Sequence, residues 1–340
     1  SDTEVIVHLV ARSHQADVTG RLIDALKQID GAYSLVCVAD DMLIGVRDPH
    51  GVRPLVLGKR DDTWILASET CALDIVGASY VRDLEPGEML TIDRTGVKSQ
   101  KPFQTVTSRF CVFEYIYFSR PDSQVEGRGV YHARKAIGAE LARESQIEAD
   151  LVIPVPDSGV PAALGYAEAS DIPFDLGIIR NHYVGRTFIQ PTQKDRTDSV
   201  KLKHNANPAA VRGKRIILVD DSIVRGTTSR KIVTMMRNAG AAEIHMRIAS
   251  PPTTHPCFYG VDTPSQDQLI AAQMSITEIA KEINADSLAF ISVDGMYRAI
   301  AGIERDVDNP HFCDACFTGD YPIRLASGLS AKRVSHGSAS

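Results

Sequence analysis

Apolar positions in the first part of the chain repeat with two different periods. Residues 1–28 carry two helical patterns: Ser1 and Glu4 have the spacing of a helix-capping box ahead of an apolar run, and residues 18–29 are amphipathic. Short β-like runs bounded by Gly, Pro, Asp and Asn then follow at 32–40, 42–48, 53–59, 63–69 and 88–93. These runs predict an antiparallel meander that forms one layer of an α+β domain.

The pattern changes near residue 105. Segment 97–108 is polar and is predicted to be a linker. Apolar strand-like runs follow at 151–155, 174–179, 215–219, 243–250 and 288–293, with helices expected near 160–169 and 228–238. Nearly continuous apolar strands between helices predict a parallel sheet covered on both faces. We therefore expect domains at 1–105 and 106–325, and a disordered tail at 326–340, where apolar residues are few.

Composition narrows the function classes. The 340 residues include 37 Lys and Arg against 43 Asp and Glu, so a net charge of −6 gives no overall attraction to nucleic acid or anionic lipid. No apolar run approaches the roughly 20 residues that span a bilayer, and the N-terminus has no basic region of a signal peptide. Six cysteines are too few for a disulfide scaffold. The sequence predicts a reduced, cytoplasmic protein that binds neither nucleic acid nor membrane.

The most informative segment is 216–228, IILVDDSIVRGTT, in which a buried strand ends in Asp220 and Asp221. Ligands of open α/β sheets bind at the carboxyl ends of strands. The backbone N–H groups of residues 225–228 at a helix N-terminus suit a phosphate monoester. The other candidate binding residues are Ser222, Arg225, Gly226, Thr227 and Thr228. The two carboxylates are placed to accept ribose hydroxyls or to bind Mg²⁺; the alternative is an ordinary acidic loop of an α/β protein.

A second loop, VPDSGVPAALGYA at 155–167, connects a strand to a helix. Asp157, Ser158 and Gly159 stand at the N-terminal end of that helix, a position that suits a pyrophosphate bound by N–H groups and hydroxyls. A simple helix cap is the alternative.

Segment 216–228 resembles the phosphoribosylpyrophosphate (PRPP) motif of the type I phosphoribosyltransferases. That resemblance implies that loop 157–159 holds the pyrophosphate, and that Ser158 binds Mg²⁺ together with Asp220 and Asp221.

A basic segment, RNHYVGRTFIQPTQKDRTDSVKLKHN at 180–205, has little helical or strand periodicity. Long irregular segments in compact domains are usually functional or disordered. Because it joins the expected phosphate-binding elements, we expect a mobile lid, with a solvated basic loop as the alternative.

Further segments resemble one family, the glutamine phosphoribosylpyrophosphate amidotransferases. They are 1–4, 46–58, 67–74, 110–123, 180–189, 200–205 and 250–264. The resemblance implies a type I phosphoribosyltransferase domain, an α/β fold with a parallel sheet and flanking helices, preceded by the C-terminal part of an α+β class II glutamine amidotransferase domain. It also implies that Arg186 is catalytic, together with Asp220 and Asp221.

The implied reaction joins ammonia to PRPP and forms 5-phosphoribosylamine and diphosphate, the first committed step of purine biosynthesis. In the family, ammonia comes from glutamine through a channel. Purine nucleotides as feedback inhibitors and a homo-oligomeric assembly are also implied.

The family's glutaminase uses an N-terminal cysteine whose own amine serves as the base. Ser1 matches a position downstream of that nucleophile. We therefore expect this chain to lack the segment that carries the cysteine, and we do not expect Ser1 to replace it.

Four cysteines stand in contexts that match the family: Cys111, Cys257, Cys313 and Cys316. In one branch of the family these positions hold a [4Fe–4S] cluster, and four thiolates are its usual ligands. Four thiolates also suit structural zinc, and free thiols are a third possibility. Cys37 and Cys71 lie in apolar strand-like runs and are expected in the core.

Two other function classes compete with the enzyme. A PRPP-binding regulator would need a DNA-binding domain or a basic face, which the net charge of −6 does not favour. A phosphoribosyltransferase that acts on a nucleobase would need contacts to a base, which the sequence does not reveal.

Overall fold

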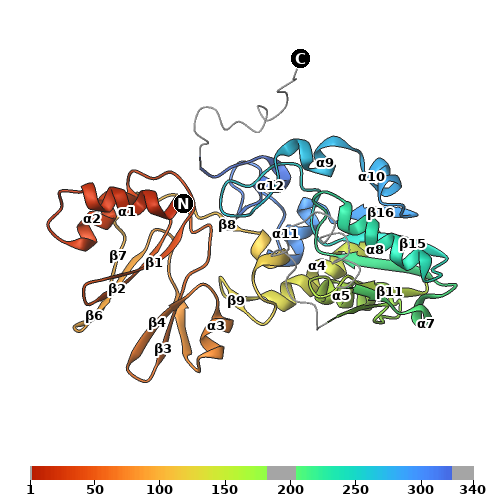
Figure 1. Cartoon of the computed structure of the whole chain (residues 1–340), viewed down its shortest axis with the longest axis horizontal. Helices are drawn as coiled ribbons and strands as arrows, with labels where there is room; N and C mark the ends of the chain where they lie inside the picture. The colour runs from red at the N-terminus through yellow and green to blue at the C-terminus, as the bar shows by residue number, and fades with distance from the viewer. Residues whose placement is uncertain (1, 182–203, 324–340) are drawn as a thin grey trace, which may run out of the picture.

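The computed structural model describes residues 2–181 and 204–323. The chain forms two parts that lie side by side in Figure 1, the first coloured red to orange and the second yellow to blue. The predicted disordered tail and most of the predicted lid, 182–203, lie outside the described residues, as does Ser1 of the predicted capping box.

The first part contains two antiparallel sheets rather than one. The first sheet has the order β1 (Ser34–Ala39), β2 (Met42–Arg47), β6 (Met89–Asp93), β7 (Gly96–Gln100). The second has the order β4 (Thr63–Ala67), β3 (Val56–Arg60), β5 (Ser79–Asp83), and α3 (Thr70–Ile75) follows β4 in the chain. The predicted single-layer meander is wrong, because β2 pairs with β6 and the chain between them forms the second layer.

Both faces of the first sheet are covered. The predicted N-terminal helices are confirmed as α1 (Asp2–Arg12) and α2 (Val18–Leu26), and Leu22 and Leu26 of α2 pack with Ile44 and Val46. The other face carries Leu90, which packs with Leu55, Leu57 and Leu84 around the second sheet. Burial on both faces explains why β2 is apolar at successive positions. The predicted linker is partly wrong, because its start belongs to β7.

The second part is built on a parallel sheet, as predicted. Its strand order is β11 (Leu151–Pro154), β14 (Arg215–Asp220), β15 (Glu243–Ile248), β16 (Ser287–Phe290). Helices α4 (Val130–Glu144), α5 (Val160–Ser170) and α11 (Val293–Ala301) contribute to the apolar cluster on one face. Helices α8 (Thr227–Asn238) and α10 (Ile276–Glu282) contribute to the cluster on the other.

The predicted strand 174–179 does not join this sheet. Only Phe174 bridges to it, at Val152, and β12 (Ile178–Arg180) instead pairs antiparallel with β13 (His204–Ala206). The shorter elements are β8 (Phe110–Cys111), π-helix η1 (Glu114–Phe118), β9 (Gln124–Val125), β10 (Arg128–Gly129), α7 (Pro208–Val211), η3 (Gln266–Gln268), α9 (Ile270–Gln273), β17 (Phe312–Cys313) and α12 (Ala315–Thr318).

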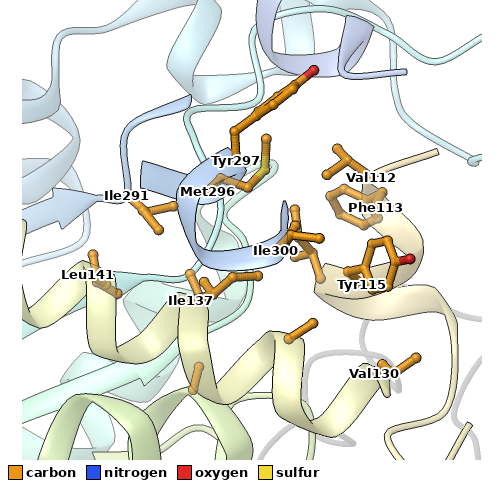
Figure 2. Packing of buried hydrophobic residues seen from close by; sticks show 14 of the residues in the cluster. Val112, Phe113, Tyr115, Val130, Ile137, Leu141, Ile291, Met296, Tyr297 and Ile300 are labelled. Carbon is orange, nitrogen blue, oxygen red and sulfur yellow. The ribbon is translucent and has the colours of Figure 1, made fainter. Parts of the chain in front are cut away.

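Segments distant in sequence build the core of the second part. Figure 2 shows Ile300 of α11 between Ile137 of α4 and Tyr115 of η1, while Tyr297 of α11 points away from α4. The two-residue strands β8 and β17 pair in parallel, which joins the start of this part to its end.

Buried charged groups connect the two parts. Arg47 of β2 is 1% exposed, and its Nη2 lies 2.7 Å from Glu126 Oε1. Arg53 Nη1 lies 3.2 Å from Glu114 Oε1. Across the described ranges, no helix is long and apolar enough to cross a membrane.

Candidate active site

The PRPP-type segment forms the strand, loop and helix that its sequence predicts. β14 ends at Asp220, and α8 begins at Thr227 with Gly226 as its N-cap. Gly226 has a φ of +73°, and a Cβ there would lie 2.8 Å from Ile270 Cδ1. A larger residue at this turn would be strained, because L side chains rarely adopt positive φ. The turn therefore presents backbone N–H groups at the start of α8, where an anion is favoured.

The acidic pair is buried and hydrogen-bonded. Asp220 and Asp221 are 7% and 8% exposed. The Asp221 N–H donates to Asp220 Oδ1 at 2.9 Å, and the hydroxyl of Ser222 donates to Asp221 Oδ2 at 2.7 Å. Burial, with the neighbouring carboxylate of Asp221, raises the pKa of Asp220 well above its usual range. A bound cation or ribose hydroxyl would compensate this buried charge.

The second predicted loop meets the first. Gly159 is the N-cap of α5, so residues 157–159 stand at that helix's N-terminus as expected. The Ser158 hydroxyl donates to Asp221 Oδ1 at 2.6 Å, although 63 residues separate them in sequence. Asp157 also forms an ion pair with Arg180 at the end of β12.

Both loops line one cavity of about 940 Å³. Its walls include eight of the predicted binding residues: Ser158, Asp220, Asp221, Ser222, Arg225, Gly226, Thr227 and Thr228. Asp157 and Gly159 flank Ser158 but do not line it. Arg186, predicted to be catalytic, lies outside the described residues. A cavity of this size matches those that bind small molecules.

The four cysteines singled out from the sequence line the same cavity: Cys111, Cys257, Cys313 and Cys316. Cys111 and Cys313 are opposite each other in the β8–β17 pair. Burial raises the pKa of the Cys111 thiol to about 12, and Glu114 adds to the shift. Among the residues that the structure describes, however, no three His, Cys, Asp or Glu side chains are arranged as a metal-binding group.

The two remaining cysteines, Cys37 and Cys71, only partly match the prediction that both lie in core strands. Cys37 is half-buried in β1, whereas Cys71 is buried in α3 and not in a strand. The backbone N–H of Cys71 donates to Ser123 Oγ at 3.4 Å, so the helix contacts the second part of the chain.

Comparison with known proteins agrees with this geometry. Residues 127–249 match the phosphoribosyl transferase domain family, and residues 1–74 match the glutamine amidotransferase domain family. The amidophosphoribosyltransferase of Rhizobium etli is 56% identical over 331 residues, which are 96% of this chain and 67% of that protein. The chain belongs to the amidophosphoribosyltransferase family.

Two further relatives support this assignment. The Bacillus subtilis amidophosphoribosyltransferase is 51% identical over 96% of this chain and 68% of its own length. The solved structure of the B. subtilis glutamine PRPP amidotransferase, complexed with ADP and GMP, superimposes with a TM-score of 0.90 at 50% identity, covering 96% of this chain and 72% of that one. The chain is thus a transferase of purine biosynthesis, with a type I phosphoribosyltransferase fold and a glutamine amidotransferase region.

Amidophosphoribosyltransferases combine two domains, and sequence reasoning missed the residues between them. A second cavity of about 700 Å³ lies where the first part meets the second. Phe118, Tyr259 and Gly260 line both cavities. In the sequence, the segments 110–123 and 250–264 that contain them carry only the family resemblance, because no local pattern indicates that a residue separates two cavities.

Proposed function

We propose that this chain forms 5-phosphoribosylamine from PRPP and ammonia in the 940 Å³ cavity. One observation carries the proposal: the Ser158–Asp221 hydrogen bond joins the two anion-binding loops at the carboxyl ends of adjacent parallel strands. The expected site of the leaving diphosphate would then lie beside the expected site of the ribose. Type I phosphoribosyl transfer needs that arrangement, because the bond that breaks lies between them.

We assign each group of residues to the charged part of the substrate that its chemistry fits. The N–H groups of residues 225–228 would bind the 5-phosphate, and loop 157–159 would bind the diphosphate. The bond between the anomeric carbon and diphosphate breaks, and its electron pair leaves with diphosphate. Ammonia supplies the electron pair of the new C–N bond and releases one proton. The transition state should resemble an oxocarbenium ion, so the buried carboxylates of Asp220 and Asp221 would stabilise its positive charge.

Mg²⁺ fits the donor set at this site. Carboxylate and hydroxyl oxygens are its preferred ligands, and Asp220, Asp221 and Ser158 supply them within one hydrogen-bonded group. A bound Mg²⁺ would neutralise charge on the departing diphosphate. Arg186 would act from the basic segment, as the family resemblance implies.

The wall shared by the two cavities supports a route for ammonia. Phe118 and Tyr259 are aromatic and face both spaces, so they can exclude water from a small neutral molecule that passes between them. We infer that ammonia released in the glutamine amidotransferase region of a family member would enter the PRPP site here.

The first prediction tests the reaction itself. The chain, incubated with PRPP, Mg²⁺ and ammonium, should release diphosphate and form phosphoribosylamine, because free ammonia needs only the phosphoribosyltransferase site. Diphosphate is measured with a coupled assay across a series of ammonium concentrations. Turnover with a free nucleobase and none with ammonium would instead favour a nucleobase phosphoribosyltransferase.

We further propose a [4Fe–4S] cluster held by Cys111, Cys257, Cys313 and Cys316. Their donor chemistry supports it, because four thiols from separate segments line one cavity, although these side chains are not arranged as a metal-binding group in the described residues. The cluster would cross-link β8, β17 and the loop around Cys257 and so add to the free energy of unfolding.

The second prediction tests the cluster. Protein purified without oxygen should be brown, and Cys313→Ser should lose the colour, the iron and part of the stability. Cys37→Ser is the matched control and should keep all three, because Cys37 lies in β1, away from this cavity. Iron and acid-labile sulfide are assayed alongside thermal unfolding. Colourless, iron-free and fully folded anaerobic protein would exclude the cluster, and stoichiometric zinc in it would favour a zinc site.

Purine nucleotides are proposed as inhibitors, and a homo-oligomer as the assembly. The B. subtilis relative was solved with ADP and GMP bound, which supports the first of these. The expected result is inhibition of ammonium-dependent turnover by purine nucleotides and not by pyrimidine nucleotides.

A further inference from the structure

A buried guanidinium lies behind the acidic pair. Arg134 of α4 is 5% exposed. Its Nε donates to the carbonyl oxygen of Tyr115 at 2.8 Å, and its Nη2 donates to that of Ser119 at 2.6 Å. These carbonyls belong to π-helix η1 and the residue that follows it, so Arg134 satisfies acceptors at the end of that helix. Within the described ranges, Nη1 has no protein acceptor.

A small cavity separates Arg134 from the site. Its volume is about 10 Å³, close to the space that one water molecule needs. The polar residues that line it are Arg134, Ser158 and Asp221. The other lining residues are apolar: Ile116, Ile137, Ala162 and Ala249. A water there would have a donor and two oxygen-bearing groups as partners, which is the environment that retains buried water.

The electrostatics of Arg134 also favour an interaction with Asp221. Among the residues described, Arg134 forms no direct ion pair with a carboxylate, yet it is buried, and an unpaired buried charge is costly. Burial lowers the pKa of Arg134, and Asp221 is the strongest of the negative charges that oppose this shift. In apolar surroundings such an interaction is stronger than at the surface.

We propose that Arg134 is a positioning residue that binds Asp221 and Ser158 through one buried water and holds the carboxylate in the orientation that the metal and diphosphate need. The inference rests on the proposed function, since it concerns the same acidic pair. The contact also ties Asp221 to η1, which ends at Phe118 in the wall between the two cavities.

The experiment measures metal binding without turnover. Mn²⁺ replaces Mg²⁺, inorganic diphosphate is added, and free Mn²⁺ is followed by electron paramagnetic resonance. Outer-shell partners of metal ligands typically change metal affinity by about 10–100-fold. We expect Arg134→Met to weaken Mn²⁺ binding by about tenfold on that basis, and Arg134→Lys to restore most of it, because a Lys keeps the positive charge.

Because Arg134→Met also removes the η1 hydrogen bonds, a second variant is needed. Ala249→Val fills the small cavity and leaves Arg134 in place. Ala142→Val is its matched control, since Ala142 is also buried in the same core but does not line the cavity. We expect only Ala249→Val to weaken Mn²⁺ binding, while thermal unfolding reports the packing cost of both variants.

The possible outcomes distinguish the role of Arg134 from the proposed function. Unchanged Mn²⁺ binding by folded Ala249→Val overturns the role of Arg134 and leaves the proposed function intact. A parent protein that binds Mn²⁺ and diphosphate no better than Asp220→Asn overturns both. If Arg134→Met does not fold, the comparison of the two Ala→Val variants decides.

Discussion

Replacing both Asp220 and Asp221 with Asn should lower the rate of ammonium-dependent turnover at least ~100-fold, equivalent to about 2.7 kcal/mol of activation free energy. The substitutions keep the size of both side chains and remove two buried negative charges beside the expected ribose. They also remove the charge that would bind Mg²⁺. Steady-state kinetics at saturating PRPP and ammonium measure the loss.

The control for this double variant is Asp262→Asn. Asp262 lines the same cavity but belongs to neither anion-binding loop, so we expect a much smaller effect on rate. Near-parental turnover by a well-folded double variant would contradict the role of the acidic pair.

The single variant Asp220→Asn should unfold at a temperature no lower than the parent at neutral pH. The folded state raises the pKa of Asp220 by burial, so this carboxyl favours folding most below its unfolded pKa. That contribution is lost as pH rises through the folded pKa, and above it the ionised group is a cost that Asn does not carry. Calorimetry without metal at several pH values measures the difference in unfolding temperature between the variant and the parent. This difference should become smaller in acid.

Gly165→Ala should destabilise the protein by roughly 2 kcal/mol or more, near the upper part of the usual cost of overpacking a core. A Cβ at Gly165 of α5 would overlap the carbonyl oxygen of Lys135, and one at Gly138 of α4 would overlap that of Ala162. The two helices therefore touch backbone to backbone, and an added methyl group must push them apart. Since α5 begins directly after loop 157–159, PRPP binding should weaken as well.

Gly20→Ala is the matched helical control. Its Cβ in α2 would meet only side-chain atoms of Gln15 and Asp17, at 3.2 Å or more. Ala is favoured over Gly in helices by about 1 kcal/mol, so this change should be neutral or stabilising. Chemical denaturation of both variants gives the comparison, and equal stability of Gly165→Ala and the parent would show that the helices can separate at no cost.

The PRPP loop was predictable because its chemistry is local. Strand, acidic pair, glycine turn and helix start all lie within 216–228, and each feature follows from its neighbours in sequence. The same holds for the N-terminus of α5. The hydrogen bond that joins the two loops follows only from the parallel pairing of β11 and β14, which the alternation of strands and helices suggests but does not specify.

What the sequence did not predict depends on distant partners. Successive apolar residues indicate that β2 is a strand, but they do not indicate that it pairs with β6, some forty residues later. Helix α4 was missed because Arg134 and Gly138 interrupt its apolar stripe. Both interruptions have a structural reason, one beneath the acidic pair and the other at the contact with α5. Residues that interrupt a local apolar pattern often make contacts with distant parts of the structure.

The pairing of β8 with β17 can form only late in the synthesis of the chain. Phe110 is opposite Phe312, and 312 − 110 gives a sequence separation of 202. A ribosome that has finished β8 must therefore translate almost the whole phosphoribosyltransferase part before the partner strand exists, whereas the antiparallel sheets of the first part are complete by residue 100. Contacts of such long range slow folding. The first part can thus fold while the chain is still growing, and the cavity that holds PRPP loops and cysteines together closes only when translation is nearly finished.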